Sequence, residues 1–101
     1  MLRVTPIQTG SMTTLKLEGN LSGPWVDELR QCWTKLVEEN VPVELDLRGL
    51  NFLDSSGTTL LLRMEREGSR LFGSSAFIHD LLHIEAVVRS TRPRRSSKKE
   101  N

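Results

Sequence analysis

Apolar and polar residues alternate along several short segments of this chain, and such alternation predicts β-strands with one buried face. The clearest segment is Met12–Glu18. Residues Leu2–Val4 predict a short first strand that ends before Pro6, because proline interrupts strand pairing. Val43–Leu47 predicts a third strand, and Ser69–Phe72 a brief fourth one. The sequence therefore supplies about four strands for a small sheet.

Helical periodicity separates these strands. Trp25–Val37 has apolar residues on one helical face and follows Pro24, which suits a first helical turn. A second helix is expected to begin at the serines of Asp54-Ser55-Ser56-Gly57 and to end before Gly68. A third is expected after Gly73-Ser74-Ser75. Its inward side chains are expected to be Phe77, Ile78, Leu81 and Leu82, with Ile84 or Val88 extending the stripe.

Strands that alternate with helices predict an α/β fold with a small sheet and helices packed on it. The helix Trp25–Val37 fits a crossover between two parallel strands. Residues Arg48–Asn51 are expected to form a turn, and Phe52-Leu53 a short extended segment. With 101 residues, a single domain is the simplest organisation.

Charge divides the chain into a body and a tail. Residues 92–101 hold five basic residues and one acidic residue without an apolar side chain, which predicts a disordered basic tail. Residues 1–91 form the expected domain, with nine basic and twelve acidic residues. A single cysteine indicates a reducing compartment, and no apolar stretch approaches the length of a membrane span. We expect a cytoplasmic protein that does not bind nucleic acid directly.

The segment Asp54-Ser55-Ser56 carries the most informative polar side chains. Asp and Ser are favoured as helix caps, so a purely structural role is one interpretation, and Ser55→Ala would then cost about 1 kcal/mol. The other interpretation is a regulatory role. Backbone N–H groups in a first helical turn stabilise negative charge, so a phosphate on a serine there would be tolerated. The two interpretations are compatible.

Other reactive residues have ordinary explanations. His79 and His83 have the spacing of a metal-binding pair but lack a third ligand, so we expect solvated helix residues. Cys32 lies in an apolar stripe and is expected to pack as a small hydrophobe. Asp46 and Asp54 are interpreted as turn caps rather than as a magnesium pair. We therefore expect no catalytic residue, metal or cofactor, and no enzymatic activity.

One continuous segment resembles a known family. Val43-Glu-Leu-Asp-Leu-Arg-Gly-Leu-Asn-Phe-Leu-Asp-Ser-Ser-Gly57 is similar to the signature of STAS domains, the family of bacterial anti-sigma factor antagonists (anti-anti-sigma factors). The resemblance extends to Leu15–Leu21, to the helix Trp25–Val37 and to Ser75–Ile84. It implies a single STAS-like α/β domain, with a small mixed sheet of about four strands, that works by binding proteins.

In phosphorylated members of this family, the second serine of Asp-Ser-Ser-Gly is modified by a partner that is both anti-sigma factor and serine kinase. The resemblance thus implies Ser56 as the phosphoacceptor, with ATP bound by the partner. The unphosphorylated form would bind the kinase, and the phosphorylated form would be released. The implied contact surface comprises Asp54, Ser55, Ser56, Gly57, Thr58 and Thr59.

Two departures from the family pattern keep an alternative open. Thr58-Thr59 occupies places where many relatives have an apolar residue and a small one, and residues 57–75 are more than a turn shorter than usual. The alternative is a STAS subunit that is not phosphorylated, as in phospholipid-transport systems or stressosome-like scaffolds.

Overall fold

Four strands and three helices alternate as expected in the computed structural model, which describes the backbone of residues 1–91 and the side chains of residues 1–84. The sheet has the order β1-β2-β3-β4 and is mixed. Strands β1 (Leu2–Thr9) and β2 (Met12–Leu21) pair antiparallel, whereas β2, β3 (Val43–Leu53) and β4 (Arg70–Phe72) pair parallel. The predicted α/β fold is confirmed. The proposed tail, residues 92–101, lies outside the described residues.

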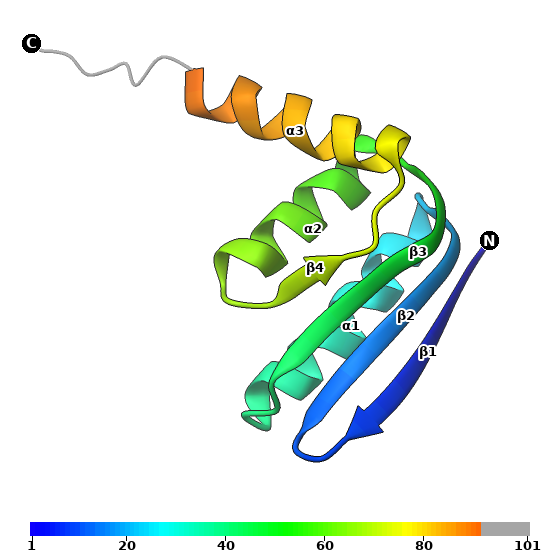
Figure 1. Ribbon diagram of the computed structural model, residues 1–101, viewed down its shortest axis with the longest axis vertical. Coiled ribbons are helices and arrows are strands. Elements are labelled where there is room, and N and C mark those ends of the chain that lie inside the picture. Colours follow the sequence, from blue (N-terminus) through cyan, green and yellow to red (C-terminus); the bar gives the residue numbers. More distant parts are fainter. Residues whose placement is uncertain (92–101) are drawn as a thin grey trace, which may run out of the picture.

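Helices α1 (Pro24–Glu38) and α2 (Ser55–Arg66) connect the parallel strands and pack against each other, while α3 (Ala76–Thr91) packs against α2 and β3 (Figure 1). The α1 prediction is confirmed. Among the described residues, no helix combines the length and apolar character needed to cross a bilayer.

The core fills the space between the sheet and the helices. Strand β2 shows the predicted alternation, since Leu15 and Leu17 are fully buried whereas Lys16 between them is half-buried. Helix α1 adds Leu29 and Trp33, and α2 adds Leu61 and Met64. Trp33 also donates an Nε1–H hydrogen bond of 2.9 Å to Ser69 Oγ, at the entrance to β4. This contact joins α1 to the α2–β4 connection.

Three local expectations were wrong. The first strand continues through Pro6 to Thr9, which is possible because β1 is an edge strand and only half of its N–H groups are needed for pairing. Residues Arg48–Asn51 form no turn but belong to β3. Phe77 and Ile84 do not face inward, since their exposed fractions are 52% and 59%. Ile78 is buried, and Leu81 and Leu82 are half-buried, as expected. The side chain of Val88 lies outside the described part.

The turn-like sequence fits a strand because β3 contains a bulge. Lys16 pairs with Asp46 and Glu18 pairs with Gly49, so β3 has one residue more than β2 across this interval. A Cβ atom on Gly49 would lie 2.8 Å from the Cγ of Glu18. The absence of a side chain at Gly49 thus allows β3 to continue past the bulge to Leu53, immediately before Asp54.

Candidate functional site

Asp54 is the N-cap of α2 and also contacts the start of α1. Its Oδ1 accepts a hydrogen bond of 2.7 Å from the N–H of Gly57, and its Oδ2 accepts one of 2.9 Å from the N–H of Gly23. The N–H groups of Gly23 and Gly57 stabilise the carboxylate and lower the pKa of Asp54. Of the residues expected to cap α2, Asp54 therefore provides the cap and Ser55 does not.

Gly57 and Thr58 belong to the interior face of this first turn. Both are buried, and a Cβ on Gly57 would lie 2.5 Å from the carbonyl oxygen of Leu21 at the end of β2. The hydroxyl of Thr58 donates a hydrogen bond of 2.9 Å to the carbonyl oxygen of Asp54. These two residues position the turn, and the Thr58 side chain is buried away from the surface.

The other members of the segment face outward. Ser55, Ser56 and Thr59 are exposed. Ser56 is the second residue of α2. Within the described residues, the hydroxyl of Ser56 has no hydrogen-bonding partner. The Ser56 hydroxyl is therefore accessible from solvent in the folded helix.

An open groove of about 540 Å³ lies beside these serines, between α1 and α2. Helix α1 contributes Asp27 and Arg30, which form an ion pair, and α2 contributes Arg63 from a position two turns beyond Ser56. Its lining residues are Gly23, Pro24, Val26, Asp27, Arg30, Ser55, Ser56, Thr59, Leu60 and Arg63.

Sequence reasoning missed Gly23, Arg30 and Arg63 as neighbours of the serines. The repeated helical spacing on α2 could have suggested Arg63, since residues 56, 59, 60 and 63 share one helical face. The positions of Gly23 and Arg30 beside the serines depend on how α1 and α2 pack, and no local sequence pattern predicts that packing.

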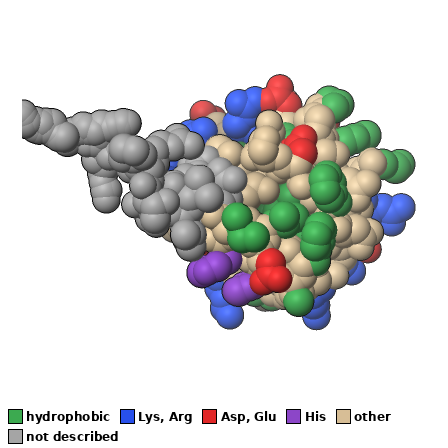
Figure 2. All heavy atoms as spheres, turned by 90° about the horizontal axis from the view of Figure 1, so that it is seen from above, with side chains coloured by type: hydrophobic (Ala, Val, Ile, Leu, Met, Phe, Trp, Pro, Cys, Tyr) green, Lys and Arg blue, Asp and Glu red, His purple; other side chains and the backbone are tan. Residues whose placement is uncertain are grey.

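Exposed hydrophobic side chains lie at the end of β3 and on α3. Phe52, two residues before the cap, has an exposed fraction of 43%. Figure 2 shows hydrophobic side chains gathered on the face seen from above, and α3 is the uppermost helix in Figure 1. Phe77 and Ile84 of α3 are exposed. Such apolar surface is typical of protein interaction sites.

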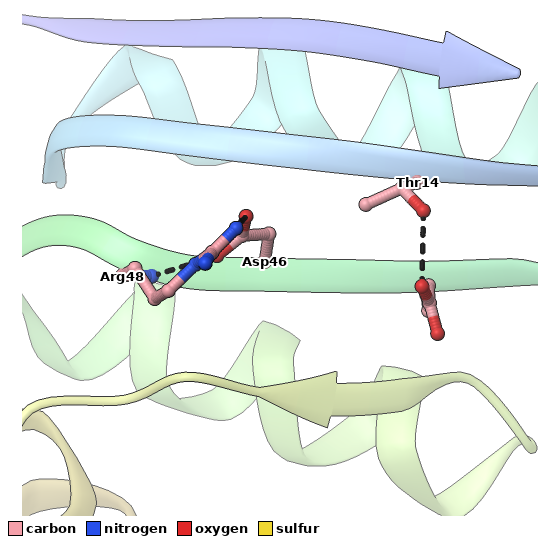
Figure 3. A network of polar contacts seen from close by, with 4 residues as sticks. Thr14, Asp46 and Arg48 are labelled. Carbon is pink, nitrogen blue, oxygen red and sulfur yellow. Dashed lines mark hydrogen bonds and ion pairs between the residues drawn. The ribbon is translucent and has the colours of Figure 1, made fainter.

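Asp46 and Asp54 have separate structural roles. Asp46 is 3% exposed and accepts hydrogen bonds of 3.0 Å from Nε of Arg48 at its Oδ1 and of 2.7 Å from Nη2 at its Oδ2 (Figure 3). The hydrogen bonds from Arg48 lower the pKa of Asp46, while burial opposes them. Each carboxylate thus accepts hydrogen bonds from the chain's own donors, Asp46 within β3 and Asp54 at the starts of α1 and α2.

The two histidines lie on α3 and the cysteine on α1. His79 and His83 are exposed, with ring centroids 6.3 Å apart. They line a smaller groove of about 260 Å³ between α2 and α3. Residues 1–84 contain no group of three or more His, Cys, Asp or Glu side chains arranged to hold a metal. Cys32 is half-buried, and desolvation raises the pKa of its thiol, which disfavours a reactive thiolate.

Comparisons with solved structures identify similar folds. The unphosphorylated form of the anti-sigma factor antagonist SpoIIAA is 20% identical, with a TM-score of 0.66 over 91% of this chain and 99% of that one. An anti-sigma factor antagonist from Mycobacterium paratuberculosis is 14% identical, with a TM-score of 0.75 over 91% and 84%. A STAS domain from Rhodobacter sphaeroides is 23% identical, with a TM-score of 0.56 over 71% and 86%. These identities establish a shared fold.

Sequence comparison adds the family. No curated protein matches the chain. A family model described as "Mlab, STAS domain" matches residues 4–86, which include most of β1, the other three strands, α1, α2 and most of α3. Because this match covers most of the chain, the protein belongs to the STAS domain family.

Proposed function

We propose that this STAS domain is an anti-sigma factor antagonist, which binds an anti-sigma serine kinase and is released when Ser56 is phosphorylated. The observation that carries the proposal is the position of Ser56. Its hydroxyl is exposed in the first turn of α2, beside an open groove, while Asp54 holds that turn to the start of α1. The kinase supplies the ATP in this scheme.

Phosphorylation would change this surface strongly. It adds about −1.5 to −2 charges and three hydrogen-bond acceptors to a serine. Residues 1–91 already have three more acidic than basic side chains. A contact surface containing Ser56 and the exposed Phe52 would therefore acquire a hydrated dianion beside apolar area, which disfavours a closely packed interface.

The surface available to a partner is narrower than the sequence implied. Ser55, Ser56 and Thr59 offer their side chains, whereas Gly57, Thr58 and Asp54 support the turn from within or from beside it. We propose the exposed three, with Phe52, as the centre of the kinase contact.

The proposal is tested by measuring affinity for an anti-sigma serine kinase of the same organism. Ser56→Ala should bind at least as tightly as the wild type and should not be released by ATP. Ser56→Asp should bind about 10-fold or more weakly. Ser11→Asp is the matched control, because it adds the same charge at an exposed serine of the β1–β2 turn, outside the proposed contact, and should bind as the wild type does. Equal affinities of Ser56→Ala and Ser56→Asp would refute the phosphorylation switch.

The alternative is a STAS interaction subunit that is never phosphorylated, for example in a phospholipid-transport system. One observation favours it, namely that the matching family model carries the description "Mlab". This subunit would bind its partner through the same exposed surface, and binding would not respond to ATP. Copurification with a transport ATPase instead of an anti-sigma factor would support this alternative.

A further inference from the structure

The groove between α1 and α2 places a cation beside the proposed phosphoacceptor. Its charged lining consists of Asp27 and Arg30 from α1 and Arg63 from α2. The nearby carboxylate of Asp54 is held by the N–H groups of Gly23 and Gly57. Arg63 lies two helical turns beyond Ser56, and besides its exposed ion pair with Glu67 it stacks over the Trp33 ring, with Cζ 5.9 Å from the ring centroid. Arg30 is therefore the better candidate partner for a phosphate.

Measured along the helix axes, the guanidinium of Arg30 lies close to the level of Ser56. The two helices begin together, since the N–H of Gly23 binds the Oδ2 of Asp54 at 2.9 Å. With a rise of about 1.5 Å per residue, Ser56 lies about 3 Å beyond its cap. The guanidinium of Arg30 pairs with Asp27, which lies about 6 Å beyond the cap of α1. An arginine side chain spans this difference readily.

Asp27 is a weak competitor for this guanidinium. The side chains of Arg30 and Asp27 are 45% and 58% exposed, and ion pairs at such exposure contribute little. A phosphoserine has a larger charge than a carboxylate and accepts two parallel hydrogen bonds from one arginine. When Ser56 is phosphorylated, Arg30 is therefore expected to pair with the phosphate in place of the Asp27 carboxylate.

We infer that the groove between α1 and α2 is a phosphate-binding site for phosphorylated Ser56, in which Arg30 leaves Asp27 and pairs with the phosphate. This inference rests on the proposed phosphorylation. The phosphate is then held against α1, and its ion pair with Arg30 closes the groove. Phosphorylation thus changes the shape of the surface around Ser56 as well as its charge.

The test uses full-length protein in which phosphoserine is introduced at position 56 during synthesis, so that no kinase is needed. The second pKa of the phosphate, about 6 in an unstructured peptide, is measured by ³¹P NMR. Pairing with Arg30 favours the dianion, so Arg30→Gln should raise this pKa by at least about 0.3 units. Asp27→Asn should lower it, because Asp27 competes for Arg30 and repels the phosphate.

Arg66→Gln is the matched control, since Arg66 is an exposed arginine of α2 that does not line the groove. It should leave the phosphate pKa at the wild-type value. The opposite shifts expected for Arg30→Gln and Asp27→Asn separate pairing from unfolding, because loss of structure moves both values in one direction.

A change below about 0.3 units in Arg30→Gln, or a change equal to that of Arg66→Gln, would overturn the phosphate-site inference. Such a result would leave the kinase switch intact, because release from the partner is measured separately. Conversely, failure of every kinase to modify Ser56 would refute the proposed function without altering the ³¹P result.

Discussion

Asp54 and Gly23 join the starts of two helices, since the Oδ2 of Asp54 accepts a 2.9 Å hydrogen bond from the N–H of Gly23. The residues are 31 positions apart in the chain. The other carboxylate oxygen of Asp54 caps α2 at Gly57. One side chain thereby fixes both the first turn that carries Ser56 and the groove beside it.

Removing this carboxylate should destabilise the domain. Asp54→Ala loses the cap and the link to α1, so we expect a cost of about 1–2 kcal/mol in the free energy of unfolding. Ser55→Ala is the matched control and should cost less than about 0.5 kcal/mol, because the Ser55 side chain is exposed and does not cap the helix. Urea denaturation monitored by tryptophan fluorescence measures both. Equal losses in the two variants would contradict the assignment of the cap.

Acid should weaken the fold through Asp46 and Asp54. Hydrogen bonds lower the pKa of both carboxyls in the folded state, so the unfolded chain binds protons more tightly. The corresponding stabilisation is present above the unfolded pKa of about 3.9 and is lost as pH falls through the lower folded values.

The acid effect is separable by mutation. Asp54→Asn removes one titrating group, so the decline in unfolding free energy below about pH 4 should be shallower than in the wild type. Denaturation curves collected from pH 6 down to pH 2.5 provide the comparison. Parallel declines in both proteins would show that Asp54 does not contribute.

Trp33 should be essential for stability. Its side chain is 2% exposed and its Nε1–H binds Ser69 Oγ, so Trp33→Ala should cost about 3–5 kcal/mol. Trp33→Phe keeps much of the apolar volume and should cost less, with the loss of one buried hydrogen bond. Ser69→Ala removes the acceptor and tests that hydrogen bond separately. An unchanged melting temperature in Trp33→Ala would refute the assigned burial.

Gly57 should resist substitution although alanine favours helices. A Cβ at this position would lie 2.5 Å from the carbonyl oxygen of Leu21, so Gly57→Ala requires α2 to move away from the end of β2. We expect destabilisation by about 1–3 kcal/mol. Ser55→Ala, in the same turn, is the control and should be nearly neutral. A stabilised Gly57→Ala protein would contradict the close approach of α2 to β2.

Several features of this fold were predictable because their causes are local. The apolar stripe of α1, the alternation in β2 and the Asp-Ser-Ser segment before α2 each contain their own signal. The family resemblance was equally local, and the match to residues 4–86 confirms it.

Other features depend on tertiary partners. Pro6 looks like the end of a strand until β1 is known to be an edge, and Arg48–Asn51 looks like a turn until the bulge against β2 is seen. Phe77 was expected to face inward, but α3 packs on α2 and β3 through the side containing Ile78. The position of Arg30 and Ser56 along one groove likewise arises from the packing of α1 against α2.

The most direct test of the central claim is mass spectrometry of the protein isolated from its native cells. Trypsin should release residues 49–63 as one peptide, which contains both serines, and fragmentation distinguishes Ser55 from Ser56. We predict a single phosphate on Ser56 in a fraction of the molecules that is not bound to the anti-sigma kinase. A phosphate confined to Ser55, or none in any growth condition while the protein binds and leaves its partner, would contradict the account.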